Sequence, residues 1–350
     1  IAWLAARGHD AALLADPHKV APAPDGGVSL APPGYGAEET QTAFLVEKLL
    51  EWHAEQGPEP WLAHVSFLRP HPPFVVPEPY ASLIAPGDFP APIPPAADQH
   101  PLERLVREAT PAAAFQPGLK GSVADLSPSD IARIRALYYG MIAEVDAQLG
   151  RLFDALKARG DWEETLVVFT SDHGEMLGDH GLLGKGGFRA EGQHIPLIVK
   201  APDGAVGEVC AHTSAADIFP TLLDLWGVDA LHEPDGSSLL PALDGTGDAG
   251  RDWALWEFDF RFILPDTTRI ALGLDDPRSC HLTVLRRADA QYVHMPALPS
   301  LLFDLRADPG ACRDLLADRS DLRLAMAEDL LKRLSFLKDE TLASLRLPLA

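Results

Sequence analysis

Apolar residues recur every three to four positions in two parts of the chain, which predicts two helices with one buried face each. The first covers residues 38–56 and ends at Gly57-Pro58. The second follows Ser127-Pro128-Ser129-Asp130, where a capping serine, a proline at the first helical position and an acid at the third favour a helix start. Its apolar positions continue over residues 131–156, and Gly160 ends the pattern.

Short apolar runs predict strands. Residues 166–169 and 195–199 are each unbroken and apolar, as in strands buried on both faces, and residues 61–68 are a further strand candidate. Near the C-terminus, the runs 253–258, 281–285 and 291–295 are separated by turn signals and fit a small antiparallel sheet. A helical tail is expected at about residues 322–337.

Two stretches rich in proline interrupt these elements. Residues 20–36 have no period and are expected to form a surface loop. Residues 75–124 are irregular and too long for an ordinary connection, and such segments are usually functional lids or disordered excursions. The sequence does not decide between these two.

The composition excludes several classes of partner. A hydrophobic content of 47% is that of a folded protein, but a net charge of -22 with no basic stripe argues against nucleic acid. No apolar run reaches the roughly 18 residues of a membrane span, so we expect no membrane partner. The cysteines Cys210, Cys280 and Cys312 are few, odd in number and far apart, which does not suggest a disulfide framework. Any site for an anion must bring its own positive charge.

One polar cluster directly follows a predicted strand. Asp172 and His173 come just after residues 166–169, and open α/β sheets bind ligands at such strand ends. A carboxylate and an imidazole suit one divalent metal, although an isolated Asp-His pair is more often a turn or a cap. Glycines at 174, 178, 181, 184, 186 and 187 let the backbone fold closely, and Lys185 can return a cation to the same point.

A second candidate, His71, lies on a proline-rich loop after residues 61–68. An imidazole can change its protonation near neutral pH and so assist at a leaving group. His64, within the predicted strand, is expected to be structural, and His194 is equally consistent with a structural role and with facing the site. Glu144 and Asp146 are two apart on the long helix and cannot easily converge on one substrate, so we expect solvated or structural roles.

These motifs together resemble those of the sulfatases and phosphonate monoester hydrolases, members of the alkaline phosphatase superfamily. The chain reads S-D-H-G-E from Ser171, M-L-G-D-H-G-L from Met176, G-K at Gly184 and H-I-P-L-I-V from His194, in the family's order. R-P-H-P-P-F at Arg69 resembles the family's H-x-P-F segment, and residues 214–227 resemble D-x-x-P-T-L-L-D-x-x-G. The L-F-D-L at 302–305 looks like the C-terminal region of phosphonate monoester hydrolases, and the resemblance covers nearly the whole chain from residue 37.

The resemblance implies a fold and roles for individual residues. It implies an α/β protein with an alkaline-phosphatase-like, mostly parallel central sheet flanked by helices. Residues 1–245 would be the C-terminal portion of that catalytic domain, and 246–350 a subdomain with a small antiparallel sheet and a helix. Asp172 and His173 would be metal ligands, Lys185 would contact the anionic oxygens of the substrate, and His71 would act at the leaving or an anionic oxygen. Asp217 and Thr221 would be structural.

The family's nucleophile is a Cys or Ser in C/S-x-P/A-x-R, and none of the three cysteines has that context. The chain also opens at Ile1 in what reads as the end of a helix, so we expect a fragment whose nucleophile and acidic ligand pair lie upstream. As it stands, such a chain should bind metal poorly and turn over nothing, because most of the coordination sphere is left to water.

Three functions are consistent with this sequence. The first is a sulfatase or phosphonate monoester hydrolase acting on a small anionic ester. The Asp172-His173 pair and the L-F-D-L at 302–305 favour phosphonate, phosphodiester or choline sulfate substrates. The second is a superfamily phosphodiesterase with a Ser or Thr nucleophile, and the third is a non-catalytic binding or scaffold protein. A carboxylate-imidazole set accepts Ca or Mn, the metals expected first, as well as Mg or Zn. The oligomeric state, including a homo-oligomer, stays open, and sparse cysteines favour the cytoplasm.

Overall fold

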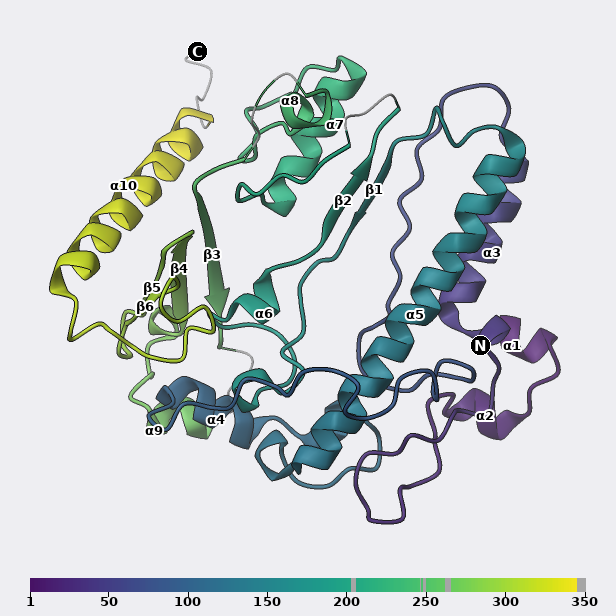
Figure 1. The fold of residues 1–350 in the computed structure, drawn as a ribbon, viewed down its shortest axis with the longest axis horizontal. Coiled ribbons are helices and arrows are strands. Elements are labelled where there is room, and N and C mark those ends of the chain that lie inside the picture. Colours follow the sequence, from purple (N-terminus) through teal and green to yellow (C-terminus); the bar gives the residue numbers. More distant parts are fainter. Residues whose placement is uncertain (203–205, 246, 248–249, 262–265, 345–350) are drawn as a thin grey trace. The chain divides into compact units, whose positions relative to one another are not determined.

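The computed structural model describes residues 1–202, 206–245, 247, 250–261 and 266–344 (Figure 1). The chain divides into two compact units that alternate along the sequence. The first unit contains Ile1–Pro94, Pro101–Glu163 and Leu177–Leu183, and the second contains Pro95–His100, Glu164–Met176 and Gly184–Ala350. The domain boundary expected at residue 245 stays a prediction.

The first unit is built around two helices that lie side by side, α3 (Gln41–Ala54) and α5 (Pro128–Arg159) (Figure 1). Helix α5 begins where the sequence predicts, because the Ser127 hydroxyl accepts a hydrogen bond from the Asp130 N–H and completes a capping box. It ends at Gly160, whose φ of 87° suits glycine. The remaining helices of this unit are α1 (Ala2–Ala6), α2 (Ala11–Ala15), η1 (Ala37–Glu39), α4 (Pro101–Ala109), η2 (Ala112–Ala114), η3 (Val123–Asp125) and η4 (Asp179–Gly181).

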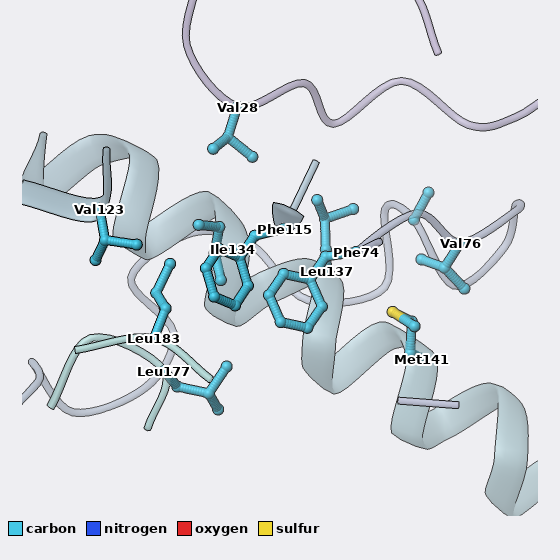
Figure 2. Close-up of a cluster of buried hydrophobic side chains, with 11 residues drawn as sticks. Val28, Phe74, Val76, Phe115, Val123, Ile134, Leu137, Met141, Leu177 and Leu183 are labelled. Carbon is cyan, nitrogen blue, oxygen red and sulfur yellow. The ribbon is translucent and has the colours of Figure 1, made fainter. Parts of the chain in front are cut away.

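The core of this unit forms on one face of α5. Figure 2 shows Ile134, Leu137 and Met141 of α5 close to Phe74 and Phe115, all of them buried. The two phenylalanine rings stack with their centroids 5.9 Å apart. The three helical residues are spaced by three and four positions, so the buried face is the one that the sequence pattern predicts. The packing also holds part of the proline-rich stretch 75–124 in a defined structure, because Val76, Phe115 and Val123 belong to the same cluster.

The second unit contains two separate sheets. Strands β1 (Val167–Thr170) and β2 (Leu197–Lys200) pair antiparallel, with Val168 opposite Val199. Strands β3 (Trp253–Asp259), β4 (His281–Arg287), β5 (Ala290–His294) and β6 (Leu301–Asp304) form an antiparallel sheet in chain order. The helices of this unit are α6 (Ala190–Gln193), η5 (Ala215–Asp217), α7 (Ile218–Trp226), α8 (Leu240–Leu243), α9 (Asp266–Ala271), η6 (Pro277–Ser279) and α10 (Ser320–Ser344).

The C-terminal sheet has a core of its own. Leu255, Leu285, Tyr292 and Leu302 lie opposite one another across the four strands, on one face. Met326 of α10 packs on this row, and Figure 1 shows α10 running beside the sheet. The predicted small antiparallel sheet and helical tail are therefore confirmed, as is the α/β class.

Three expectations about strands need correction. The described ladders are all antiparallel, so the mostly parallel pairing expected of the central sheet is not found among them. Residues 61–68 are not a strand in the structure, because no described segment forms a ladder with them. Strands β1 and β2 are also not buried on both faces: Val168 and Val199 face the apolar side chains of α7, whereas Ile198 remains 63% exposed. Within the described ranges, no helix is both long and apolar enough to cross a membrane.

Candidate active site

Asp172 and His173 lie at the end of β1, where backbone and side-chain hydrogen bonds hold the turn. The Thr170 hydroxyl donates to the Pro196 carbonyl at 2.9 Å, which closes the β1–β2 pair at this end. The Ser171 hydroxyl donates to the carbonyl of His173 at 2.8 Å, and the His173 N–H donates to the Asp172 carboxylate at 3.0 Å. The carboxylate is 82% exposed and the imidazole 25% exposed, so both can be reached from solvent.

The His173 ring is held in one tautomer. Its Nδ1 lies 2.8 Å from the Gly174 carbonyl oxygen, which can only accept, so Nδ1 carries the proton. The Nε2 therefore carries the lone pair, and the Lys185 ammonium lies 2.6 Å from it. The Asp172 carboxylate is 3.4 Å from the same Nε2. The structure thus brings three of the four predicted site residues together.

Gly174 is required where the segment after His173 passes closest to α6. Its N–H donates to the Gly192 carbonyl at 3.0 Å, and a Cβ at this position would lie 2.0 Å from the Glu191 carbonyl oxygen. Any larger residue would push the two segments apart. Since the Gly174 carbonyl fixes the His173 tautomer, this close approach also positions the His173 Nε2.

The donor set fits a divalent metal, but incompletely. A ring nitrogen whose partner nitrogen donates to a backbone carbonyl is the usual arrangement of a metal-binding histidine, and a carboxylate lies beside it. Within the described ranges, no cluster of three or more His, Cys, Asp or Glu residues could hold a metal ion. Asp172 and His173 can therefore supply two ligands, and a full coordination sphere needs further ones.

His71 lies in the first unit, whereas Asp172, His173 and Lys185 lie in the second. Its side chain is exposed, its Nδ1 is 2.6 Å from the Pro72 carbonyl, and its N–H donates to the Leu68 carbonyl at 2.9 Å. Its convergence with the other three residues stays a prediction. The structural role expected of His64 stays a prediction, and its side chain is exposed. His194 is also exposed, its N–H donates to the Ala190 carbonyl of α6, and both of its possible roles stay predictions.

The buried ion pair between Arg69 and Glu144 was not predicted from the sequence. Arg69 donates to the Glu144 carboxylate at 2.9 Å, and the two side chains are 8% and 0% exposed. The Thr40 hydroxyl, which also caps α3, donates to the same carboxylate at 2.5 Å, and Thr42 lies 3.3 Å from it. Glu144 is therefore structural rather than solvated, and it holds the segment that leads into His71. No local signal reveals this, because the partners are 75 to 104 residues apart in sequence.

Asp217 and Thr221 are structural, as the sequence predicts. The buried Asp217 carboxylate pairs with Arg251 and accepts a hydrogen bond from the Ser237 N–H at 2.8 Å. The Thr221 hydroxyl accepts from the Leu239 N–H at 2.9 Å. Both side chains connect α7 to the segment that follows it.

Residues 4–228 match the sulfatase family model. The chain belongs to the sulfatase family. Among curated relatives, the chain is 39% identical over 294 residues to the multifunctional alkaline phosphatase superfamily protein PehA of Trinickia caryophylli. The alignment covers 80% of this chain and 56% of that protein. It is 29% identical over 282 residues to the choline-sulfatase of Rhizobium meliloti, covering 77% of this chain and 50% of that protein. The chain thus spans about half the length of these relatives.

Solved structures agree with this family assignment. The phosphonate monoester hydrolase of Agrobacterium radiobacter superposes with a TM-score of 0.88 at 45% identity, over 95% of this chain and 68% of that one. The phosphonate monoester hydrolase of Silicibacter pomeroyi gives a TM-score of 0.85 at 32% identity, over 97% and 68% of the two chains. The alkaline-phosphatase-like fold of the sulfatase family, inferred above from motifs, is therefore confirmed.

Proposed function

We propose that this chain is part of a metal-dependent hydrolase that cleaves small anionic esters, with phosphonate monoesters or phosphodiesters favoured over sulfate esters. The observation that carries the proposal is the cluster of Asp172, His173 and Lys185. The Lys185 ammonium and the Asp172 carboxylate both lie close to the His173 Nε2, so one cation and two possible metal ligands are adjacent. The 45% identity to a phosphonate monoester hydrolase over nearly the whole chain supports the substrate class.

Asp172 and His173 would hold the metal, with Ca or Mn expected first and Mg or Zn also compatible with the donors. When bound, such an ion polarises a non-bridging oxygen of the ester. Lys185 would then turn from the His173 Nε2 to an anionic oxygen of the substrate and offset the charge that develops there. His71 would donate a proton to the leaving oxygen.

The nucleophile would come from sequence outside these 350 residues. Cys210, Cys280 and Cys312 are followed by Ala-His-Thr, His-Leu-Thr and Arg-Asp-Leu, none of which matches the family's nucleophile motif. We expect these 350 residues alone to bind metal weakly and to turn over no ester. We also propose a cytoplasmic location, because the cysteines of the sequence are few and odd in number.

The test is Lys185→Ala in the protein that carries this chain, assayed with nitrophenyl esters of sulfate, a phosphonate and a phosphodiester. We expect turnover to fall by roughly 10²-fold, the usual scale for losing one such electrostatic contact. Lys48→Ala is the matched control, since Lys48 is an exposed lysine on α3 that pairs with the neighbouring carboxylates of Glu47 and Glu51. Unchanged kinetics in Lys185→Ala would refute the assignment.

The same panel and the nucleophile position separate the alternatives. A Cys-x-Pro-x-Arg motif in the remainder of the protein supports the proposal, and Ser or Thr at that position favours a phosphodiesterase. Neither residue there, together with no turnover of any ester, favours a non-catalytic scaffold.

A further inference from the structure

The segment that carries Lys185 has little intrinsic order. Its sequence is Gly184-Lys185-Gly186-Gly187, and the three glycines all have positive φ, at 84°, 102° and 81°. Glycines restrict the backbone least, and a long lysine side chain loses much conformational entropy when it is held in place. Neighbouring parts of the fold must therefore define where the ammonium lies.

One face of the C-terminal sheet provides that support. Side chains alternate along β3, so Trp253 and Leu255 pack toward α10 while Trp256 and Phe258 point to the opposite face. The Trp256 indole N–H donates to the Gly187 carbonyl at 3.1 Å. The Phe258 ring lies against Gly186 so closely that a Cβ there would be 2.2 Å from the ring.

The residue that follows the glycines is held by the same face. Phe188 is 1% exposed, and its ring stacks on Phe303 of β6 with the centroids 6.3 Å apart. Its carbonyl accepts a hydrogen bond at 2.8 Å from the side chain of Gln291, which lies opposite Phe303 in the ladder between β5 and β6. Residues 186–188 therefore contact three strands of the sheet, immediately beyond the lysine.

We propose that Trp256 and Phe258 are positioning residues that hold Lys185 over His173. The inference rests on the proposed function, because it assigns the C-terminal sheet a task in the same site. The buried row toward α10 stabilises the sheet, and the opposite face sets the backbone from which the ammonium reaches the His173 Nε2. The C-terminal sheet thereby becomes part of the catalytic apparatus without touching substrate.

The test is a double-mutant cycle between Trp256→Phe and Lys185→Ala in the protein that carries this chain. Trp256→Phe keeps an aromatic ring but removes the only donor of the side chain, and we expect turnover of the phosphonate ester to fall about 5-fold. Lys185→Ala alone should cost roughly 10²-fold. If Trp256 acts through Lys185, adding Trp256→Phe to Lys185→Ala should cause no further loss.

Trp253→Phe is the matched control, because Trp253 lies on the same strand but packs toward α10. We expect it to leave turnover unchanged, and thermal unfolding of each variant separates lost positioning from lost folding. The same cycle on the affinity for inorganic phosphate gives a readout that requires no turnover. Effects of Trp256→Phe and Lys185→Ala that multiply, or a Trp256→Phe variant with wild-type kinetics and phosphate affinity, would overturn the positioning role alone. A silent Lys185→Ala would overturn the proposed function itself, and this inference with it.

Discussion

Glu144→Gln tests the buried ion pair that precedes His71. The substitution keeps the size of the side chain but removes its charge, so Arg69, whose side chain is 8% exposed, loses its compensating carboxylate. Removing one partner of a buried ion pair typically costs about 3 to 5 kcal/mol. Glutamine keeps one carbonyl oxygen that can accept from Arg69 or Thr40, so we expect the lower value, a loss of about 3 kcal/mol.

Asp154→Asn is the matched control for this measurement. It removes one negative charge from the same helix, α5, but Asp154 pairs with Lys157 at 3.9 Å and both side chains are more than half exposed, at 81% and 54%. Exposed pairs of this kind contribute at most about 0.5 kcal/mol. Both variants therefore remove a negative charge from the same helix, and the difference between them is that Glu144 is buried and Asp154 is exposed.

Urea denaturation followed by far-ultraviolet circular dichroism gives the change in the free energy of unfolding. The expected result is a lower midpoint for Glu144→Gln at an unchanged slope. A loss below about 1 kcal/mol, or one equal to that of Asp154→Asn, would show that the buried pair contributes no more than a surface pair, and the reasoning from burial would be wrong. Replacing Glu144 and Arg69 together by Leu and Met should recover most of the loss, because no buried charge then remains uncompensated.

Two further predictions concern pH and metal. Burial raises the pKa of Asp130, but hydrogen bonds from Ser127 and from the Val28 N–H outweigh this effect and hold the pKa below its usual value. Asp130 therefore stabilises the fold above its unfolded pKa of about 4, and this stabilisation is lost as pH falls through the lower folded pKa. The free energy of unfolding of Asp130→Asn should consequently depend less on pH in the acid range than that of the wild type. An identical dependence in both proteins would contradict this. Because Lys185 occupies the lone pair of His173, Lys185→Ala should also raise the affinity of the chain for Mn²⁺ by about 10-fold, and unchanged affinity in calorimetry would show that ammonium and metal do not compete.

Local sequence signals predicted the parts of this protein that depend on near neighbours. The start and end of α5 follow from Ser127, Asp130 and Gly160, because a capping box and a left-handed terminal glycine involve residues within one turn of the helix. The order of strand, Asp172-His173 and Lys185 was also recognisable, and the structure brings these three side chains together. His71, which lies in the other compact unit, stays a prediction of the sequence alone.

Only the tertiary structure decided the pairing of strands and the support of the site. The sequence of β1 and β2 is equally compatible with parallel and antiparallel neighbours, since both are short apolar runs, and the antiparallel ladder appears only when the chain returns through residues 171–196. The burial of Glu144 and the contact of Trp256 with Gly187 likewise join residues 69 to 104 positions apart. Periodicity and capping act over a few residues, whereas hydrogen-bond ladders and buried charges depend on which distant segments pack together. The sequence therefore predicted which residue types form this site, and only the tertiary structure determined their arrangement.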